Sequence, residues 1–222
     1  MSQDRITRGA SLEAALEALP LFPLPQTVLF PECLLPLHVF EPRYRAMTKD
    51  AIETHRCIAV VLVTDATAVD DHGHPAIASV AGVGEIIDHT ELPGGRYDIL
   101  LRGRARVRLA ELPFVPPYRR ARATVLHSIA TPVSSSDRAA LSSSAAGFAA
   151  RVRERDESFE LRIPRDAPVG VVADLCAQHL IVDARERQRC LETLDEAERV
   201  RRVIEALAVQ SVELGGRRGV MN

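Results

Sequence analysis

Residues 19–45 read LPLFPLPQTVLFPECLLPLHVFEPRYR, and this stretch decides the fold of the first half of the chain. Prolines interrupt its Leu, Val and Phe residues at short intervals. Proline fixes φ and donates no hydrogen bond, so it lies at strand starts, edges and bulges. The pattern therefore predicts short, bent strands around a core, one over residues 28–30 and another over 34–40. Glu41-Pro42 then begins a helix, because proline is favoured at the first helical position.

The segments that follow combine strand patterns with Gly and Pro turns. Residues 57–64 form a continuous, largely β-branched run, which indicates a buried strand, and 65–75 form a polar loop. Glycines at 82 and 84 predict a bulge or a close backbone contact, and Gly103 predicts a break between strands. Strands are expected over 78–90, 97–101, 105–109 and 120–127. Many short strands with such turns indicate a small barrel or folded sheet.

After residue 129 the pattern becomes helical. Asp137 is predicted to cap one helix, and residues 169–182 form a strongly apolar second one. The pairs Asp183/Glu186 and Asp195/Glu198 fit capping boxes at the starts of two more helices. We therefore predict an α+β chain, with a β-rich pseudo-barrel subdomain over 1–128 and a helical bundle over 129–222.

Composition excludes several classes of function. The 222 residues are 46% hydrophobic and 26% charged with a net charge of −2, so no global field favours nucleic acid or an anionic membrane. The start MSQDRITRGAS lacks the apolar core of a secretory signal, and the longest apolar run, 57–63, is too short to span a bilayer. We expect a cytoplasmic protein without membrane contact. The four cysteines lack C-x-x-C spacing and are expected to be buried thiols.

Lysine usage bears on enzyme chemistry. Lys49 is the only lysine, and it follows no glycine-rich loop, so the residues of a P-loop are missing. A Ser–Lys peptidase dyad needs a lysine in a dry site, whereas Lys49 belongs to a predicted charged helix face. We therefore expect no ATPase or peptidase chemistry, and we predict no catalytic residue, metal ligand or cofactor site.

Candidate binding residues are found in two places. Arg102, Arg104, Arg106 and Arg108 alternate along the strand pattern, which predicts a guanidinium row on one face of the sheet. Such a row is either a solvated surface or a site for acidic peptides or RNA phosphates. Phe40 and Tyr44 flank the predicted strand-to-helix corner. They belong either to the core or to a peptide groove beside an exposed strand edge.

Two other clusters have ordinary interpretations that we prefer. Asp71, His72 and His74 are residue types that bind divalent metals, but they are also common in solvated turns. Cys176 and His179 are one helical turn apart, which suggests a nucleophile and base, but both lie in an apolar helix and fit a core thiol and imidazole.

The motifs LFPLP, VLFP and LPLHVFEPRYR, in this order, closely resemble the opening of the N-terminal substrate-binding domain of Lon proteases. The run GVGEIIDHTELPGGRYDILLRGRARVRL (residues 82–109) resembles the second motif of that domain, and RQRCLETLDEAERVRRVIEAL (187–207) is similar to its helical part. The resemblance covers nearly the whole chain. It implies a PUA-like pseudo-barrel, in stand-alone form without the ATPase and peptidase modules of Lon.

The resemblance also implies a function. The expected role is non-catalytic recognition of unfolded or partner polypeptides. The alternative is an RNA-binding module that uses the arginine row.

Overall fold

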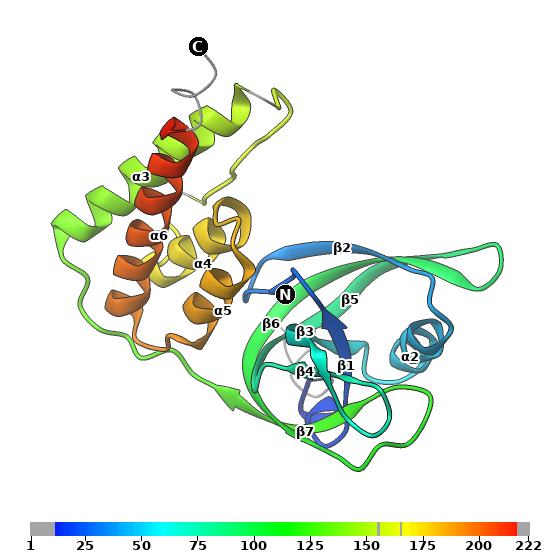
Figure 1. The fold of residues 1–222 in the computed structure, drawn as a ribbon. Coiled ribbons are helices and arrows are strands. Elements are labelled where there is room, and N and C mark those ends of the chain that lie inside the picture. Colours follow the sequence, from blue (N-terminus) through cyan, green and yellow to red (C-terminus); the bar gives the residue numbers. More distant parts are fainter. Residues whose placement is uncertain (1–11, 155, 165, 217–222) are drawn as a thin grey trace. The chain divides into compact units, whose positions relative to one another are not determined.

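The computed structural model describes residues 12–154, 156–164 and 166–216, with side chains to residue 212. Residues 1–11, in which we expected no secretory signal, lie outside the described part. The chain forms two compact units, Met1–Leu126 and His127–Asn222, and each is described by itself. The first contains the seven described strands and the helix Pro42–Glu53, and the second is built of helices (Figure 1), which confirms the α+β class. Among the described residues, no helix has the length and apolar character to cross a membrane.

A closed sheet forms the first unit. The strands are β1 (Leu19–Leu24), β2 (Leu34–Val39), β3 (Cys57–Val69), β4 (Pro75–Ile77), β5 (Val80–Leu92), β6 (Arg96–Glu111) and β7 (Arg120–Leu126). Their order is β1-β7-β6-β5-β3-β4, and a parallel pairing of β1 with β3 closes the ring into the expected barrel (Figure 1). Helix α2 (Pro42–Glu53) begins with proline at its first turn, as predicted, and buries Tyr44, Met47, Thr48 and Ala51.

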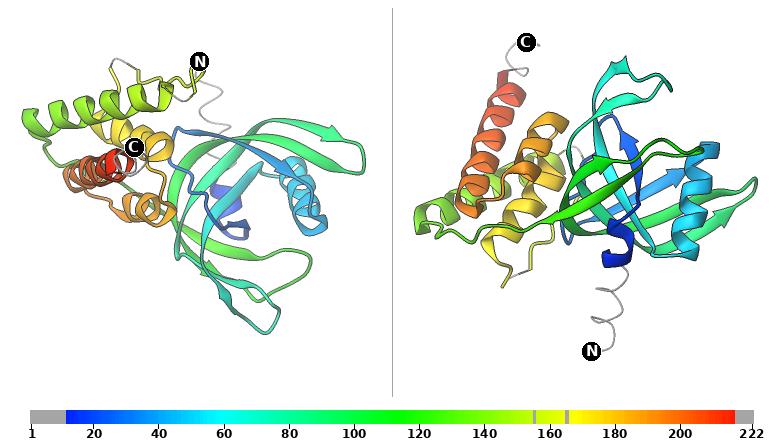
Figure 2. Two further views of the ribbon diagram at one scale, coloured as in Figure 1. Left: turned by 45° about the horizontal axis from the view of Figure 1, so that its top comes forward. Right: turned by 90° about the horizontal axis from the view of Figure 1, so that it is seen from below.

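One expected strand boundary and one expected strand are wrong. Strand β3 continues through the predicted loop to Val69 and forms a hairpin with β4 that extends away from the barrel (Figure 2). Residues 28–30, predicted as a strand, form no strand. They cross the sheet instead, and Val28, Leu29 and Phe30 are almost completely buried.

Glycines permit this crossing. A Cβ atom at Gly82 would lie 1.8 Å from the carbonyl oxygen of Leu29, and one at Gly103 would lie 1.9 Å from that of Phe30. The backbone of Gly103 is bonded to the crossing segment, because its N–H donates to Cys33 O (2.8 Å) and its C=O accepts from Glu32 N (2.9 Å). The close backbone contact predicted at Gly82 is therefore confirmed.

Strand β6 is continuous, so the break predicted at Gly103 is wrong. The strand carries a bulge there, since Gly84 pairs with Gly103 but Val83 pairs with Ala105. The extra residue is Arg104. A bulge of one residue changes which side chains face each side of a strand. Even-numbered residues of β6 before the bulge therefore face one side of the sheet, and even-numbered residues after it face the other.

Helices α3 (Ser135–Arg153), α4 (Val169–Leu180), α5 (Ala184–Glu192) and α6 (Glu196–Gly216) form the second unit. Asp137 was predicted to cap α3, but the cap is Ser134, whose hydroxyl oxygen accepts the N–H of Asp137 (3.0 Å). The caps at Asp183 and Asp195 are confirmed, because each carboxylate accepts the N–H three residues ahead, both at 2.8 Å. All four cysteines are buried and free, as predicted.

A buried ion pair joins two of these helices. Arg199 of α6 places Nε 3.0 Å from Asp174 Oδ1 of α4, and both side chains are at most 5% exposed. Arg199 Nη1 also donates to the carbonyl of Thr193 (2.6 Å). A buried pair of this kind is costly to break, because the remaining charge would have no partner.

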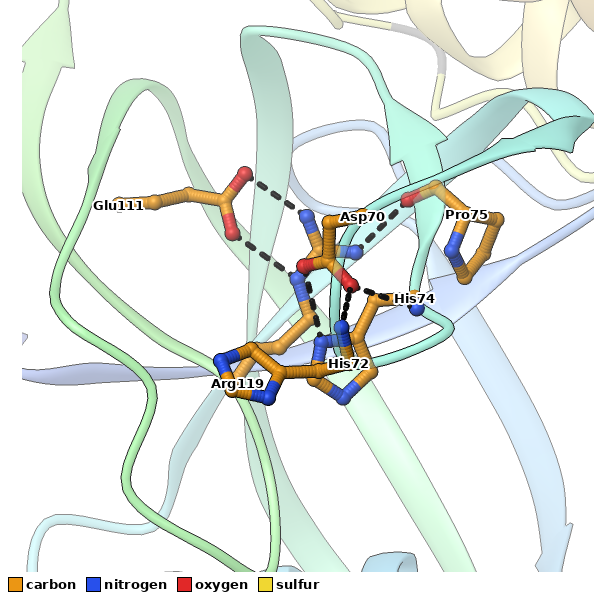
Figure 3. Close-up of polar contacts among 6 residues, drawn as sticks. All are labelled: Asp70, His72, His74, Pro75, Glu111 and Arg119. Atoms are coloured by element: carbon orange, nitrogen blue, oxygen red, sulfur yellow. Dashed lines mark hydrogen bonds and ion pairs between the residues drawn. The ribbon is translucent and has the colours of Figure 1, made fainter.

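The tip of the β3–β4 hairpin is organised by one carboxylate (Figure 3). Asp70 Oδ1 accepts the N–H groups of His72 (2.9 Å) and His74 (2.8 Å), and Oδ2 lies 3.1 Å from His74 Nδ1. Arg119 donates to Pro75 O (2.9 Å) and forms a bidentate pair with Glu111 (Figure 3). The N–H donors, that of His74 first, lower the pKa of Asp70 to about 2.

The first prediction concerns the crossing. Gly103→Ala should destabilise the first unit by about 3 kcal/mol or more, because the new methyl group overlaps a backbone carbonyl that cannot rotate away. Amide hydrogen exchange, read peptide by peptide, should show faster exchange in β5 and β6.

The matched control is Gly147→Ala. Gly147 is an exposed residue of α3 with nothing within 4 Å of an added Cβ. Alanine there should leave exchange in α3 unchanged or slower by the gain in helix propensity. Equal tolerance of both substitutions would contradict the account of the crossing.

The second prediction concerns acid. Because the native pKa of Asp70 lies below its unfolded value, the hydrogen-bonded carboxylate stabilises the hairpin tip above about pH 4, and this contribution disappears as the pH falls towards 2. The amide resonances of His72 and His74 should titrate together with a midpoint near 2 in NMR spectra. Asp70→Asn should abolish this titration. A midpoint near the ordinary value of 3.8 would contradict the hydrogen bonds.

Candidate functional site

One face of the sheet formed by β2, β6 and β5 carries charged and exposed apolar side chains close together. Directly opposed residues of antiparallel strands share a face. Leu34 of β2 opposes Arg102 of β6, and Arg102 in turn opposes Glu85 of β5. These three side chains therefore lie on the same side of the sheet. We call this side the open face.

A hollow of about 260 Å³ lies on the open face, lined by Arg56, Glu85, Ile86, Ile87, Arg102 and Arg104. Arg102 Nη2 donates to Glu32 Oε2 at 2.8 Å, and Arg104 Nε lies 3.5 Å from Glu85 Oε2. We call it the arginine hollow. Its three guanidinium groups come from Arg56, directly before β3, from Arg102 of β6, and from Arg104, the bulge residue of β6.

Arg56 is held in place by the backbone. Its φ of 58° is in the left-handed region, and its N–H donates to Ala51 O (2.7 Å), which ends α2. Its Nε donates to the carbonyl of Ile86 (2.8 Å), whose own N–H donates to Arg56 O (2.7 Å). This reciprocal pairing fixes the guanidinium at the hollow.

The predicted arginine row does not lie on one face. Arg106 opposes Gly82, on the side where the 28–33 segment crosses, and it is 3% exposed with its guanidinium 5.8 Å from the centre of the Phe30 ring. Arg108 opposes Val80 on that same side and is exposed. The single-face arrangement is therefore wrong, because the bulge at Arg104 separates Arg102 and Arg104 from Arg106 and Arg108.

Strand β2 has an open edge. Among the described strands it pairs only with β6. Because Gly103 N–H donates to Cys33 O in this register, the backbone groups of Leu35 and Leu37 face β6 and those of Leu34, Pro36 and His38 face the open edge. A proline whose missing N–H points to an open edge costs no ladder bond.

Apolar side chains stand at both ends of this edge. Leu34 is 48% exposed and Phe40 is 60% exposed. The ring of His38 stacks on Phe40 with 6.1 Å between centroids, and His38 Nδ1 lies 2.6 Å from Asp98 Oδ1 across the strand pair. The predicted binding residue Phe40 is thus presented on the surface.

Tyr44 lies instead in the core. Its ring centroid is 4.5 Å from that of Phe22. The Cζ atom of Arg43 lies 4.6 Å from the centre of the Tyr44 ring and makes a cation–π contact with it. Burial raises its pKa. Of the two interpretations of Phe40 and Tyr44, the surface one therefore fits Phe40 and the core one fits Tyr44.

The remaining clusters have structural roles. The rings of His72 and His74 pack on Phe114, with centroids 4.9 Å and 4.4 Å from it. Within the described residues, no group of three His, Cys, Asp or Glu is arranged to hold a metal ion. Burial raises the pKa of the Cys176 thiol to about 12, so it is not a thiolate near neutral pH.

Sequence reasoning missed most of the arginine hollow. Arg56 follows a helix and precedes a buried strand, and Glu85 follows Gly84, so neither belongs to a charged pattern. The register that brings them beside Arg102 depends on two bulges, at Arg104 and at Ile87. The sequence signal that could have indicated an irregular register here is the pattern of glycines at 82, 84 and 103.

Known proteins are similar to this chain in sequence. The curated relatives include the Lon protease of Roseiflexus castenholzii, 30% identical over 86% of this chain and 24% of the relative, and Lon protease 2 of Myxococcus xanthus, 29% identical over 86% and 23%. The chain thus spans about a quarter of the length of these relatives.

Solved structures share the fold. The Lon N-terminal domain protein from Xanthomonas campestris aligns with a TM-score of 0.62 at 21% identity, covering 85% of this chain and 97% of that one. The N-terminal domain of Mycobacterium avium complex Lon protease aligns with a TM-score of 0.58 at 18% identity, covering 86% and 98%. The family model of the ATP-dependent protease La (LON) substrate-binding domain matches residues 18–209. The chain therefore belongs to the LON substrate-binding domain family.

Proposed function

We propose that this chain is a non-catalytic, cytoplasmic module that binds unfolded or partner polypeptides along the open edge of β2. The observation that carries the proposal is the exposure of Leu34 and Phe40 beside unpaired backbone groups of an apolar strand. Family membership supports the same class of ligand.

The edge suits an extended peptide. The N–H groups of Leu34 and His38 and the carbonyls of Leu34, Pro36 and His38 face away from β6, as argued above. An added strand would pair with them, and main-chain hydrogen bonds of this kind give affinity without sequence preference. Leu34 and Phe40 then supply apolar contacts for alternate side chains of the peptide.

Side-chain chemistry supports a non-catalytic role. Lys49 is exposed on α2, whereas a Ser–Lys dyad needs a lysine in a dry site. Cys176 is buried, and its pKa of about 12 disfavours the thiolate. Neither side chain has the environment of an activated nucleophile.

The alternative function, RNA binding by an arginine row, loses its geometric basis. A row on one face would follow a phosphate backbone, but Arg106 is buried and Arg108 lies on the other side of the strand from Arg102. The hollow's lining also contains no aromatic ring on which a base could stack.

The third prediction tests polypeptide binding. Leu34→Ser combined with Phe40→Ser should weaken binding of a permanently unfolded, carboxymethylated model protein by about tenfold, because two exposed apolar contacts are removed. Fluorescence anisotropy with the labelled unfolded protein measures the affinity. On binding, amide hydrogen exchange should slow at Leu34 and His38.

The matched control is Val115→Ser, which removes an apolar side chain that is 62% exposed and lies outside β2. It should leave the affinity unchanged. Undiminished binding by the Leu34/Phe40 variant would reject the β2 edge. Binding of a labelled oligouridylate in preference to the unfolded protein would reject the proposed function in favour of RNA.

A further inference from the structure

We propose that the arginine hollow is a carboxylate-binding subsite that takes an acidic side chain of the bound polypeptide. This inference rests on the proposed function and deepens it, since it states which chemical group the polypeptide must carry.

The guanidinium groups have donors to offer. An arginine carries five N–H donors. Among the described residues, Arg56, Arg102 and Arg104 each make one side-chain polar contact through a single nitrogen, to Ile86 O, Glu32 and Glu85 respectively. The contact of Arg104 is long, at 3.5 Å. The remaining N–H groups can therefore bind an incoming oxygen pair.

The size of the hollow suits a side chain. Pockets for whole small molecules have volumes of about 300–1,000 Å³. At about 260 Å³ the hollow lies below that range. Ile87, which is 43% exposed, provides apolar surface next to the guanidinium groups, whereas Ile86 is buried and contributes its backbone carbonyl. A carboxylate on a short methylene stem matches this combination of apolar and cationic surface.

The charge favours a carboxylate over a phosphate chain. Three guanidinium groups and the two carboxylates of Glu32 and Glu85 give a net charge of +1. One bound carboxylate neutralises this charge. A polyphosphate backbone would bring several negative charges close to the two glutamates, which repel them. The existing partners of Arg102 and Arg104 are themselves carboxylates, so these two donors are already arranged for this group.

The position connects the subsite to the β2 edge. Leu34 opposes Arg102, so the exposed leucine and the hollow lie on the same face. An extended polypeptide along β2 would place alternate side chains on that face. An acidic residue beside an apolar one is therefore the pattern that the open face would select.

The fourth prediction tests this subsite by fluorescence anisotropy with two labelled peptides. In the first, leucine alternates with glutamate; in its twin, glutamine replaces every glutamate. The wild-type chain should bind the acidic peptide more tightly. Arg104→Gln should weaken that binding by about tenfold, the effect of losing a charge-assisted hydrogen bond, and leave the glutamine twin unaffected.

The matched control is Arg108→Gln. Arg108 is exposed on the same strand but faces the other side of the sheet. This variant should bind the acidic peptide like the wild type. An equal loss of affinity in the Arg104 and Arg108 variants would overturn the subsite, because it would show an effect of net charge alone.

A gain of affinity provides a second test. Glu85 competes with the incoming carboxylate for Arg104, so Glu85→Gln should tighten binding of the acidic peptide several-fold. Misfolding cannot produce such a gain. A decrease or no change would contradict the role assigned to the hollow.

The outcomes separate this inference from the proposed function. If the wild type binds both peptides equally, polypeptide recognition stands and the carboxylate subsite is rejected. If the wild type binds neither peptide nor the unfolded protein, the proposed function fails and the inference fails with it. If an oligouridylate binds and Arg104→Gln abolishes its binding, the hollow is a phosphate site and the inference is overturned.

Discussion

The first unit depends on a backbone-to-backbone contact inside its sheet. The carbonyls of Leu29 and Phe30 occupy space that side chains would fill at Gly82 and Gly103. This contact places the 28–33 segment across the barrel and delivers β2 to β6 in a fixed register. Since a register slip of one residue exchanges the two faces of a strand, the surface of β2 is set by these glycines.

The same contact generates the candidate site. Gly103 bonds to Glu32 and Cys33 through its backbone, and the extra residue of β6 follows directly as Arg104. The bulge turns the charged halves of β6 to opposite sides. One side receives Arg102 and Arg104 beside Glu85, and the other receives Arg106 under the Phe30 ring. A chain without the bulge would present a uniform basic strip; with it, the charge is concentrated at one hollow.

Much of the architecture could be predicted from the sequence. Proline and glycine punctuation, the buried run after Cys57 and the capping residues Asp183 and Asp195 are local signals, and each corresponds to an observed element. The resemblance carried the fold and the family. What failed was non-local: residues 28–30 have strand composition but are held by a tertiary contact, and β3 extends because β4 is there to pair with it.

The candidate site was the least predictable part for the same reason. Alternation along one strand placed four arginines in a row, but face assignment depends on pairing with β5, which a single strand does not reveal. Arg56 reaches the hollow through a left-handed residue conformation after α2, and no composition signal marks it. The sequence did not distinguish Tyr44, which packs on Phe22 in the core, from Phe40, which lies on the surface.

The closure of the barrel has a consequence for the order of folding. Strand β1 pairs with β3 along one edge and with β7 along the other, and Leu19 meets Ala121 about a hundred residues later. Loop closure over such a distance is slow compared with the formation of a hairpin such as β5–β6. During synthesis, β1 can join β3 early, but the ring stays open until β7 has left the ribosome. Until then a growing chain of this fold exposes strand edges of its own, and it resembles the unfolded polypeptides that we propose it binds.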